Sequence, residues 1–132
     1  MTNNTEDALH ATVQDLMNFG VRANLEELDK SYHEDLVVMD LNIEGRLVSL
    51  KKQEVLGMLR EVFKDRSPED NLWYKIHSLT VNGDRGHVLI ARKIPLGGPM
   101  MHIELSIDFV FDGDRWQVMR EVNFSRPDAE AA

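Results

Sequence analysis

Cysteine is absent from the 132-residue sequence. This absence excludes disulfide bonds, zinc sites built on thiolates and thiol nucleophiles. The sequence also lacks an apolar run near the roughly 18 residues that a membrane-spanning helix needs. Its first residues, Met1 to Asp7, are polar and acidic, and they lack the basic start and apolar core of a secretory signal. We therefore expect a cytoplasmic protein without a membrane span.

Basic residues are outnumbered: 15 Lys and Arg residues stand against 23 Asp and Glu residues, which gives a formal net charge of −8. Such a charge repels nucleic acid and anionic membrane surfaces, and no local basic cluster offsets it. We expect neither as a partner. Hydrophobic residues make up 42% of the chain, enough for the core of one domain. We place that domain at residues 1–125 and a disordered tail at residues 126–132.

Helical periodicity is confined to the first half of the chain, where apolar residues recur three and four positions apart in three segments. Each segment has a local start signal, such as Thr5 as a cap or Asn24 and Glu27 at capping-box spacing. The expected helices run from Thr5 to Phe19 with Gly20 as the terminator, from Asn24 onward, and from after Ser49 to near Asp65.

Strand patterns fill the rest. Leu36 to Leu41 is apolar on both faces, so we expect it to be covered on two sides. After Trp73 the residues alternate between apolar and polar, interrupted by Asn82-Gly83 and by Asp112-Gly113-Asp114, both of which favour tight turns. Helices followed by strands indicate an α+β protein. We predict a cone in which N-terminal helices pack inside a curved antiparallel sheet, with a pocket at its open end.

Two stretches resemble a known family. From Tyr32 to Asp40 the order is aromatic, x, x, Asp, apolar, x, apolar, x, Asp, and from Phe109 to Val118 an apolar strand turns at Gly113 and returns through Trp116. Both are similar to segments of the nuclear transport factor 2-like superfamily, which includes the SnoaL-like cyclases and the ketosteroid isomerases. The resemblance covers almost the whole chain. It implies the cystatin-like cone fold, whereas the fold alone does not fix a chemistry.

The resemblance places Asp40 where the isomerases carry their proton-abstracting aspartate, so Asp40 is the candidate catalytic base. The alternative is that Asp40 starts the turn toward Gly45 and bonds to backbone amides. The same resemblance places Leu16 and Ile107 where the isomerases carry the two donors that stabilise the enolate. Losing such a donor costs about 10²-fold or more in rate, so the sequence argues against ketosteroid isomerisation.

Two arginines interrupt apolar strand faces. Arg92 follows Val88 and Ile90, and Arg120 follows Val118. If these faces line the pocket, the guanidinium groups can bind a carboxylate; alternatively, each arginine lies at the mouth with its stem on apolar surface. The candidate ligand-binding residues are Arg92, Arg120, Leu16, Ile107, Phe109 and Phe124.

Neither a metal nor a cofactor is expected. His102 and Glu104 share a strand face, but two ligands fall short of the three that a catalytic zinc site uses. Phosphate-binding and dinucleotide-binding motifs are absent.

Three functions remain open: a binding module for a small, partly apolar and acidic molecule, a cyclase-like or isomerase-like enzyme that uses Asp40, and an interaction domain with a vestigial pocket. A half-apolar outer sheet face also predicts a homodimer. Its residues are Leu89, Ala91, Val110 and Met119, with Ser106, Gln117 and Asn123 among them.

Overall fold

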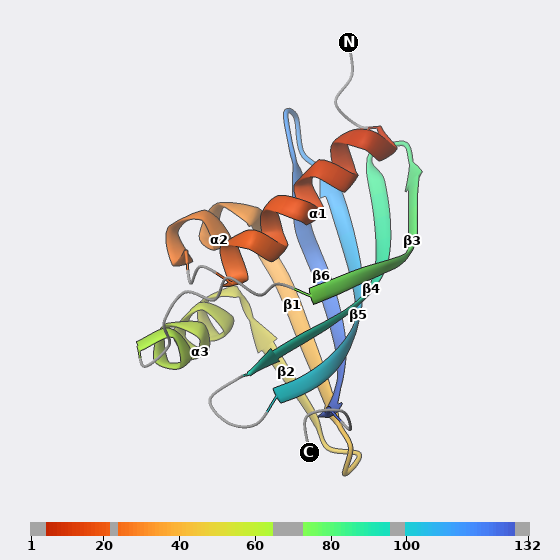
Figure 1. Cartoon of the computed structure of the whole chain (residues 1–132). Coiled ribbons are helices and arrows are strands. Elements are labelled where there is room, and N and C mark those ends of the chain that lie inside the picture. Colours follow the sequence, from red (N-terminus) through yellow and green to blue (C-terminus); the bar gives the residue numbers. More distant parts are fainter. Residues whose placement is uncertain (1–4, 22–23, 65–72, 96–99, 129–132) are drawn as a thin grey trace.

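The computed structural model describes residues 5–21, 24–64, 73–95 and 100–128. Three helices lie on the concave side of a bent six-stranded sheet (Figure 1). The elements are α1 (Glu6–Val21), α2 (Leu25–Ser31), β1 (Tyr32–Asn42), β2 (Leu47–Lys51), α3 (Lys52–Lys64), β3 (Trp73–Asn82), β4 (Arg85–Pro95), β5 (Met100–Phe111) and β6 (Trp116–Pro127). In the described part of the chain, no helix is long and apolar enough to cross a membrane.

The sheet has the strand order β2-β1-β6-β5-β4-β3. Neighbouring strands are antiparallel with one exception, because β1 and β6 run parallel through pairs such as Val38 with Glu121. The α+β class and the cone of helices inside a curved sheet are therefore confirmed, and the sheet is mixed. The parallel pair joins the first strand to the last strand, near the middle of the sheet.

Local signals correctly predict where α1 and α2 begin. Thr5 Oγ1 accepts a hydrogen bond from the backbone N–H of Ala8 at 3.1 Å, and Asn24 Oδ1 accepts one from that of Glu27 at 3.2 Å. These two caps start α1 and α2 as expected. The expected end of the first helix was wrong, because α1 continues through Gly20 to Val21.

Strand β2 was not predicted. The first residues of the expected third helix pair with β1 instead, through Val38 with Leu50 and Val37 with Lys51. The helix begins three residues after Ser49, where Glu54 Oε1 accepts a hydrogen bond from the Lys51 N–H at 3.0 Å. At the other end of the chain, β6 continues to Pro127, past the expected boundary at residue 125. The predicted loop at residues 96–99 lies outside the described residues.

The core lies between α1 and the concave sheet face. Gly86 on β4 permits their close approach, because a Cβ atom there would lie 2.7 Å from Leu9 Cδ2. The fully buried side chains come from both layers, which pack as helix on sheet: Leu9, Val13 and Met17 on α1, and Leu36, Val88, Ile90, Ile107, Phe109 and Val118 on the strands.

A β-bulge changes the faces of β6. Phe109 pairs with Val118 and Asp108 pairs with Arg120, so Met119 is an extra residue on β6. Beyond an extra residue, inward and outward positions exchange. Glu121 and Asn123 therefore face the concave side, and the expectation that Asn123 lies on the outer face was wrong. Arg120 and Phe124 face outward, and the expectation that they share a face with Val118 was wrong.

The two faces predict different responses to truncation. Phe109→Ala should lower the free energy of unfolding by about 3–5 kcal/mol, because it leaves a cavity in the core. Arg120→Ala should change it by less than about 0.5 kcal/mol, because the side chain is exposed. Urea denaturation of both variants measures this difference. Equal effects, or a larger loss for Arg120→Ala, would contradict the assignment of faces.

Candidate functional site

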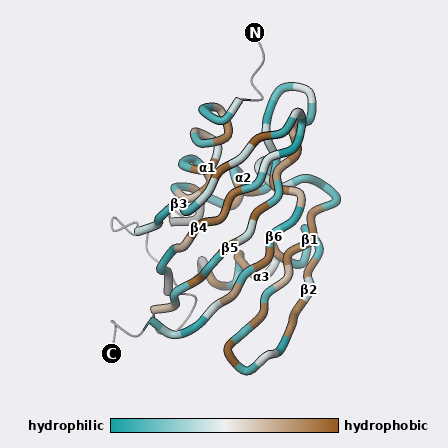
Figure 2. Tube along the Cα trace, turned by 90° about the vertical axis from the view of Figure 1, so that its right-hand side faces the viewer, coloured by the Kyte–Doolittle hydropathy of each residue, from teal (hydrophilic) through white to brown (hydrophobic). Residues whose placement is uncertain are grey.

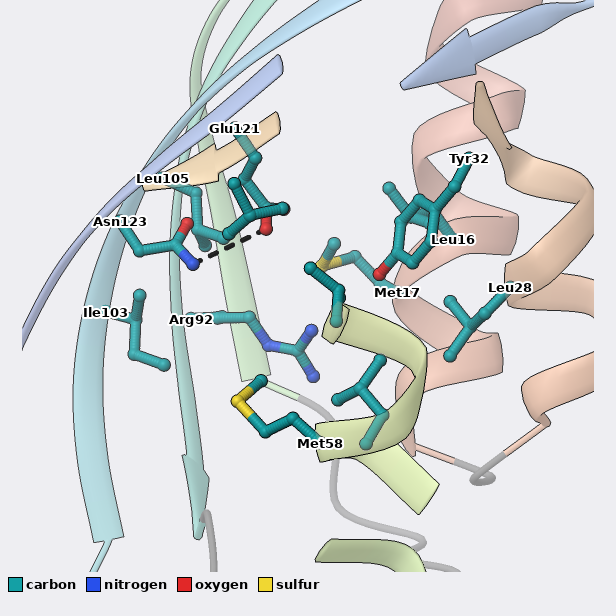
Figure 3. A pocket seen from close by; sticks show the side chains of 13 residues that line it. Leu16, Met17, Leu28, Tyr32, Met58, Arg92, Ile103, Leu105, Glu121 and Asn123 are labelled. Carbon is teal, nitrogen blue, oxygen red and sulfur yellow. Dashed lines mark hydrogen bonds between the residues drawn. The ribbon is translucent and has the colours of Figure 1, made fainter. Parts of the chain in front are cut away.

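A cavity of about 120 Å³ lies between the three helices and the concave face of the sheet (Figure 3). Most of its lining is aliphatic or thioether carbon, so it offers an apolar environment. The apolar lining residues are Leu16, Met17, Leu28, Val38, Val55, Met58, Leu59, Ile103 and Leu105. The polar lining residues are Tyr32, Arg92, Glu121 and Asn123. The chemistry of the site therefore depends on these four side chains.

Arg92 supplies the cation of the cavity. It follows Val88 and Ile90 at alternate positions of β4, and this alternation directs all three side chains to the concave face. Its residue exposure is 9%, and its guanidinium group lies in the cavity above Met58 of α3 (Figure 3). A cation so enclosed by apolar groups interacts strongly with any nearby anion, since little water screens it.

Glu121 and Asn123 enter the cavity from β6 because of the bulge at Met119. The Asn123 Nδ2 group donates a hydrogen bond to Glu121 Oε2 at 3.4 Å. Burial raises the pKa of the Glu121 carboxyl above its ordinary value; the hydrogen bond from Asn123 and the charge of Arg92 act in the opposite direction, and the charge of Asp40 adds to the increase. Loss of solvation outweighs the neighbouring cation, so the carboxyl takes up its proton at a higher pH than an exposed glutamate does.

Tyr32 begins β1 and points its hydroxyl into the cavity from the side opposite Glu121 and Asn123 (Figure 3). Burial, and secondly the negative charge of Glu121, raise the pKa of the phenol, while Arg92 lowers it. The net increase keeps the hydroxyl protonated, so Tyr32 is a neutral hydrogen-bond donor. The mutual influence of Tyr32, Arg92 and Glu121 shows that the three groups share one electrostatic environment.

Asp40 lies on the concave face but outside the set of cavity-lining residues. It is two residues beyond Val38 on β1 and pairs with Asn123 of β6. The hydroxyl of Ser125 donates a hydrogen bond to its Oδ1 at 3.4 Å. Asp40 therefore continues the polar row that Glu121 and Asn123 begin on the sheet. Its role as a general base stays a prediction.

The other candidate residues divide into three groups. Leu16 lines the cavity together with Arg92. Ile107 and Phe109 are completely buried in the core and are not part of the lining. Arg120 is exposed on the outer face opposite Asp108, and Phe124, 47% exposed, borders a shallow outer groove. The two arginines thus lie on opposite faces of the sheet.

Sequence reasoning missed Tyr32, Glu121 and Asn123 as site residues. Regular alternation from Trp116 and Val118 predicts residues 120, 122 and 124 on the concave face, and no residue around Met119 indicates a bulge. The one available signal was Arg120, a charge on a face that was expected to be apolar. Tyr32 contributed only to the family resemblance, because an aromatic residue at the start of a strand is also typical of a core position.

The site can do three things chemically. Arg92 can bind an anion, Tyr32 can donate a hydrogen bond, and Glu121 can hold or release a proton. Within the described residues, no three His, Asp or Glu side chains come together in a way that would hold a metal ion.

No protein-family model matches this sequence, and no curated protein sequence does. Solved structures do match it. A nuclear transport factor 2-like protein of unknown function from Silicibacter pomeroyi superimposes with a TM-score of 0.79 at 17% identity, over 96% of this chain and 100% of that one. A nuclear transport factor 2-like protein from Cytophaga hutchinsonii superimposes with a TM-score of 0.78 at 12% identity, over 93% of this chain and 99% of that one.

A ketosteroid isomerase-like protein from Erwinia carotovora atroseptica superimposes with a TM-score of 0.73 at 15% identity, over 96% of this chain and 100% of that one. At these identities the matches establish the fold and leave the chemistry to the residues of the cavity. The chain has the nuclear transport factor 2-like fold, as its sequence resemblance implied.

Proposed function

We propose that this protein binds a small, partly apolar molecule with an acidic group inside the cone. The observation that carries the proposal is the guanidinium group of Arg92, 9% exposed in a cavity that is otherwise largely apolar. Placing a charge among apolar groups is costly, and a site that anchors an anion gives that charge a role. A carboxylate fits the planar guanidinium through two parallel hydrogen bonds.

Glu121 supports the same ligand. Because its pKa is raised, proton uptake removes the negative charge that would compete with a bound carboxylate for Arg92. The protonated carboxyl can also donate a hydrogen bond to the ligand. An acidic ligand and a proton on Glu121 therefore favour each other, so we expect affinity for an anion to increase as Glu121 is protonated.

The size and lining of the cavity restrict the ligand further. An apolar protein cavity of about 150 Å³ holds benzene, and this one measures about 120 Å³. The space is smaller than one that holds benzene but is partly open to solvent, so a monocarboxylate with a short hydrocarbon chain, such as hexanoate, can place part of its chain against the thioether and aliphatic lining. Met17 and Met58 can adjust to its shape, because methionine side chains are flexible and polarisable.

Hexanoate should bind to the protein and raise its melting temperature, since a ligand that binds only the folded state stabilises it. Arg92→Leu should weaken binding at least about tenfold, because a hydrogen bond to a charged group contributes about 1.5–3 kcal/mol. Glu121→Gln should keep or strengthen binding. Calorimetry and chemical-shift titration measure both effects.

Arg120→Leu is the matched control, since it removes an exposed arginine from the outer face of the same sheet. It should leave hexanoate binding unchanged. Hexan-1-ol, which has the same chain without the charge, should bind independently of residue 92. If hexanoate binds equally to the Arg92→Leu and Arg120→Leu variants, or to none of the folded variants, the proposal is wrong.

We further propose that two copies pair through the outer face of the sheet. The outer side of β1, expected to be covered, is only partly buried in the single chain at Val37, Met39 and Leu41. Leu47 and Phe124 add exposed apolar surface beside it, and Figure 2 shows apolar stretches along β1, β2 and their hairpin. A contiguous apolar face of this kind is typical of an interface.

Charge supports a second copy as the partner. Although the chain carries a net charge of −8, the outer face has both signs: Arg120 lies opposite Asp108, and Arg126 Nη2 lies 3.7 Å from Glu104 Oε1. A surface with both signs can complement itself across a two-fold axis.

Light scattering at micromolar concentration should therefore give twice the chain mass of 15.2 kDa. Phe124→Asn should shift the mass toward that of one chain, because it places an amide in the apolar interface. Val48→Asn is the control: Val48 is similarly exposed but pairs with Asp40 and so faces the concave side. A single-chain mass for the unmodified protein would contradict the dimer.

A further inference from the structure

Tyr32 presents a donor that the protein itself does not use. Its residue exposure is 7%, and its hydroxyl points into the cavity (Figure 3). Among the described residues, that hydroxyl has no hydrogen-bond partner, whereas the backbone carbonyl of the same residue accepts a bond from Lys52 Nζ at 3.0 Å. The hydroxyl is accessible from the cavity, so it has capacity for a ligand.

We infer that the ligand is bifunctional: beside the acidic group held by Arg92, it carries a hydrogen-bond acceptor, such as a ketone oxygen, that the Tyr32 hydroxyl binds. The inference rests on the proposed function and specifies its ligand class as a short oxo acid. A plain fatty acid would leave the donor unused.

The arrangement of the cavity supports two separate contacts. Tyr32 enters the cavity from the start of β1, next to the helices, while Arg92 enters it from β4 on the side of the sheet (Figure 3). A ligand that reaches both sides therefore needs polar atoms at two points and carbon between them. The phenol keeps its proton and can donate it to a ketone oxygen, which can only accept.

The test compares three ligands, one plain acid and two oxo acids, on two proteins. Dissociation constants are measured by titration calorimetry for hexanoate and for 4- and 5-oxohexanoate, with the unmodified protein and with Tyr32→Phe. The substitution keeps the aromatic ring and removes only the hydroxyl. The preference for the better oxo acid over hexanoate should fall about tenfold in the variant, the size expected when a buried acceptor loses its donor.

Tyr74→Phe is the matched control, because Tyr74 packs against the core but does not line the cavity. It should leave the preference unchanged. If hexanoate binds through Arg92 but Tyr32→Phe leaves the preference unchanged, the inference fails and the proposed function stands.

The neutral ketone 2-hexanone separates the remaining outcomes. It should perturb the amide resonances of cavity residues in the unmodified protein and much less in Tyr32→Phe. If the acids fail to bind and 2-hexanone shows this dependence, the donor role of Tyr32 stands and the acidic ligand does not. If neither the acids nor 2-hexanone binds, both the inference and the proposed function are wrong.

Discussion

The presence of charge inside an apolar cavity is the constraint on which the site depends. Arg92 and Glu121 both line a space that is otherwise surrounded by Leu, Val, Ile and Met side chains, and transferring either charge there from water is unfavourable. The arrangement reduces this cost in two ways. Glu121 receives a hydrogen bond from Asn123, and the positive charge of Arg92 opposes the increase in its pKa. Burial still prevails, so the pKa of the carboxyl is raised. Protonation of Glu121 removes a negative charge from the cavity. Proton uptake by Glu121 therefore favours the binding of an acidic ligand.

The bulge at Met119 makes this arrangement possible. Without the extra residue, Arg120 and Val122 would continue the concave face from Val118, and Glu121 would face outward. With it, the concave face of β6 changes from apolar to polar at the height of the cavity. The same change puts Val122 and Phe124 on the outer face, where they extend the apolar surface of β1. One irregularity in one strand thus contributes both to the interior site and to the surface through which we propose that two copies pair.

Much of the fold could be predicted from the sequence because its signals are local. Thr5 and Asn24 cap helices through their own side chains, and Gly83 and Gly113 adopt the positive φ angles that their turns need, 65° and 79°. Strand β2 could not be predicted in this way, since Leu47–Lys51 becomes a strand by pairing with β1. The site depends on the same kind of long-range information: Arg92 follows a regular alternation and was identified, whereas Glu121 and Asn123 follow a bulge and were missed. Asp40, identified by resemblance, lies on the concave face, but the carboxyl that lines the cavity belongs to Glu121.

The buried carboxyl can be tested through the pH dependence of stability. A group whose pKa is higher in the folded than in the unfolded chain makes the folded state bind more protons between those two values, so the free energy of unfolding falls as pH rises through that interval. For Glu121 the interval begins near its ordinary value of 4.5. The most direct measurement is the free energy of unfolding of the unmodified protein minus that of Glu121→Gln, from urea denaturation at a series of pH values. We expect this difference to be largest at acidic pH, to decrease as pH rises from about 4.5, and then to level off. A difference that is independent of pH, or that increases with pH, would contradict a buried Glu121 in the cavity.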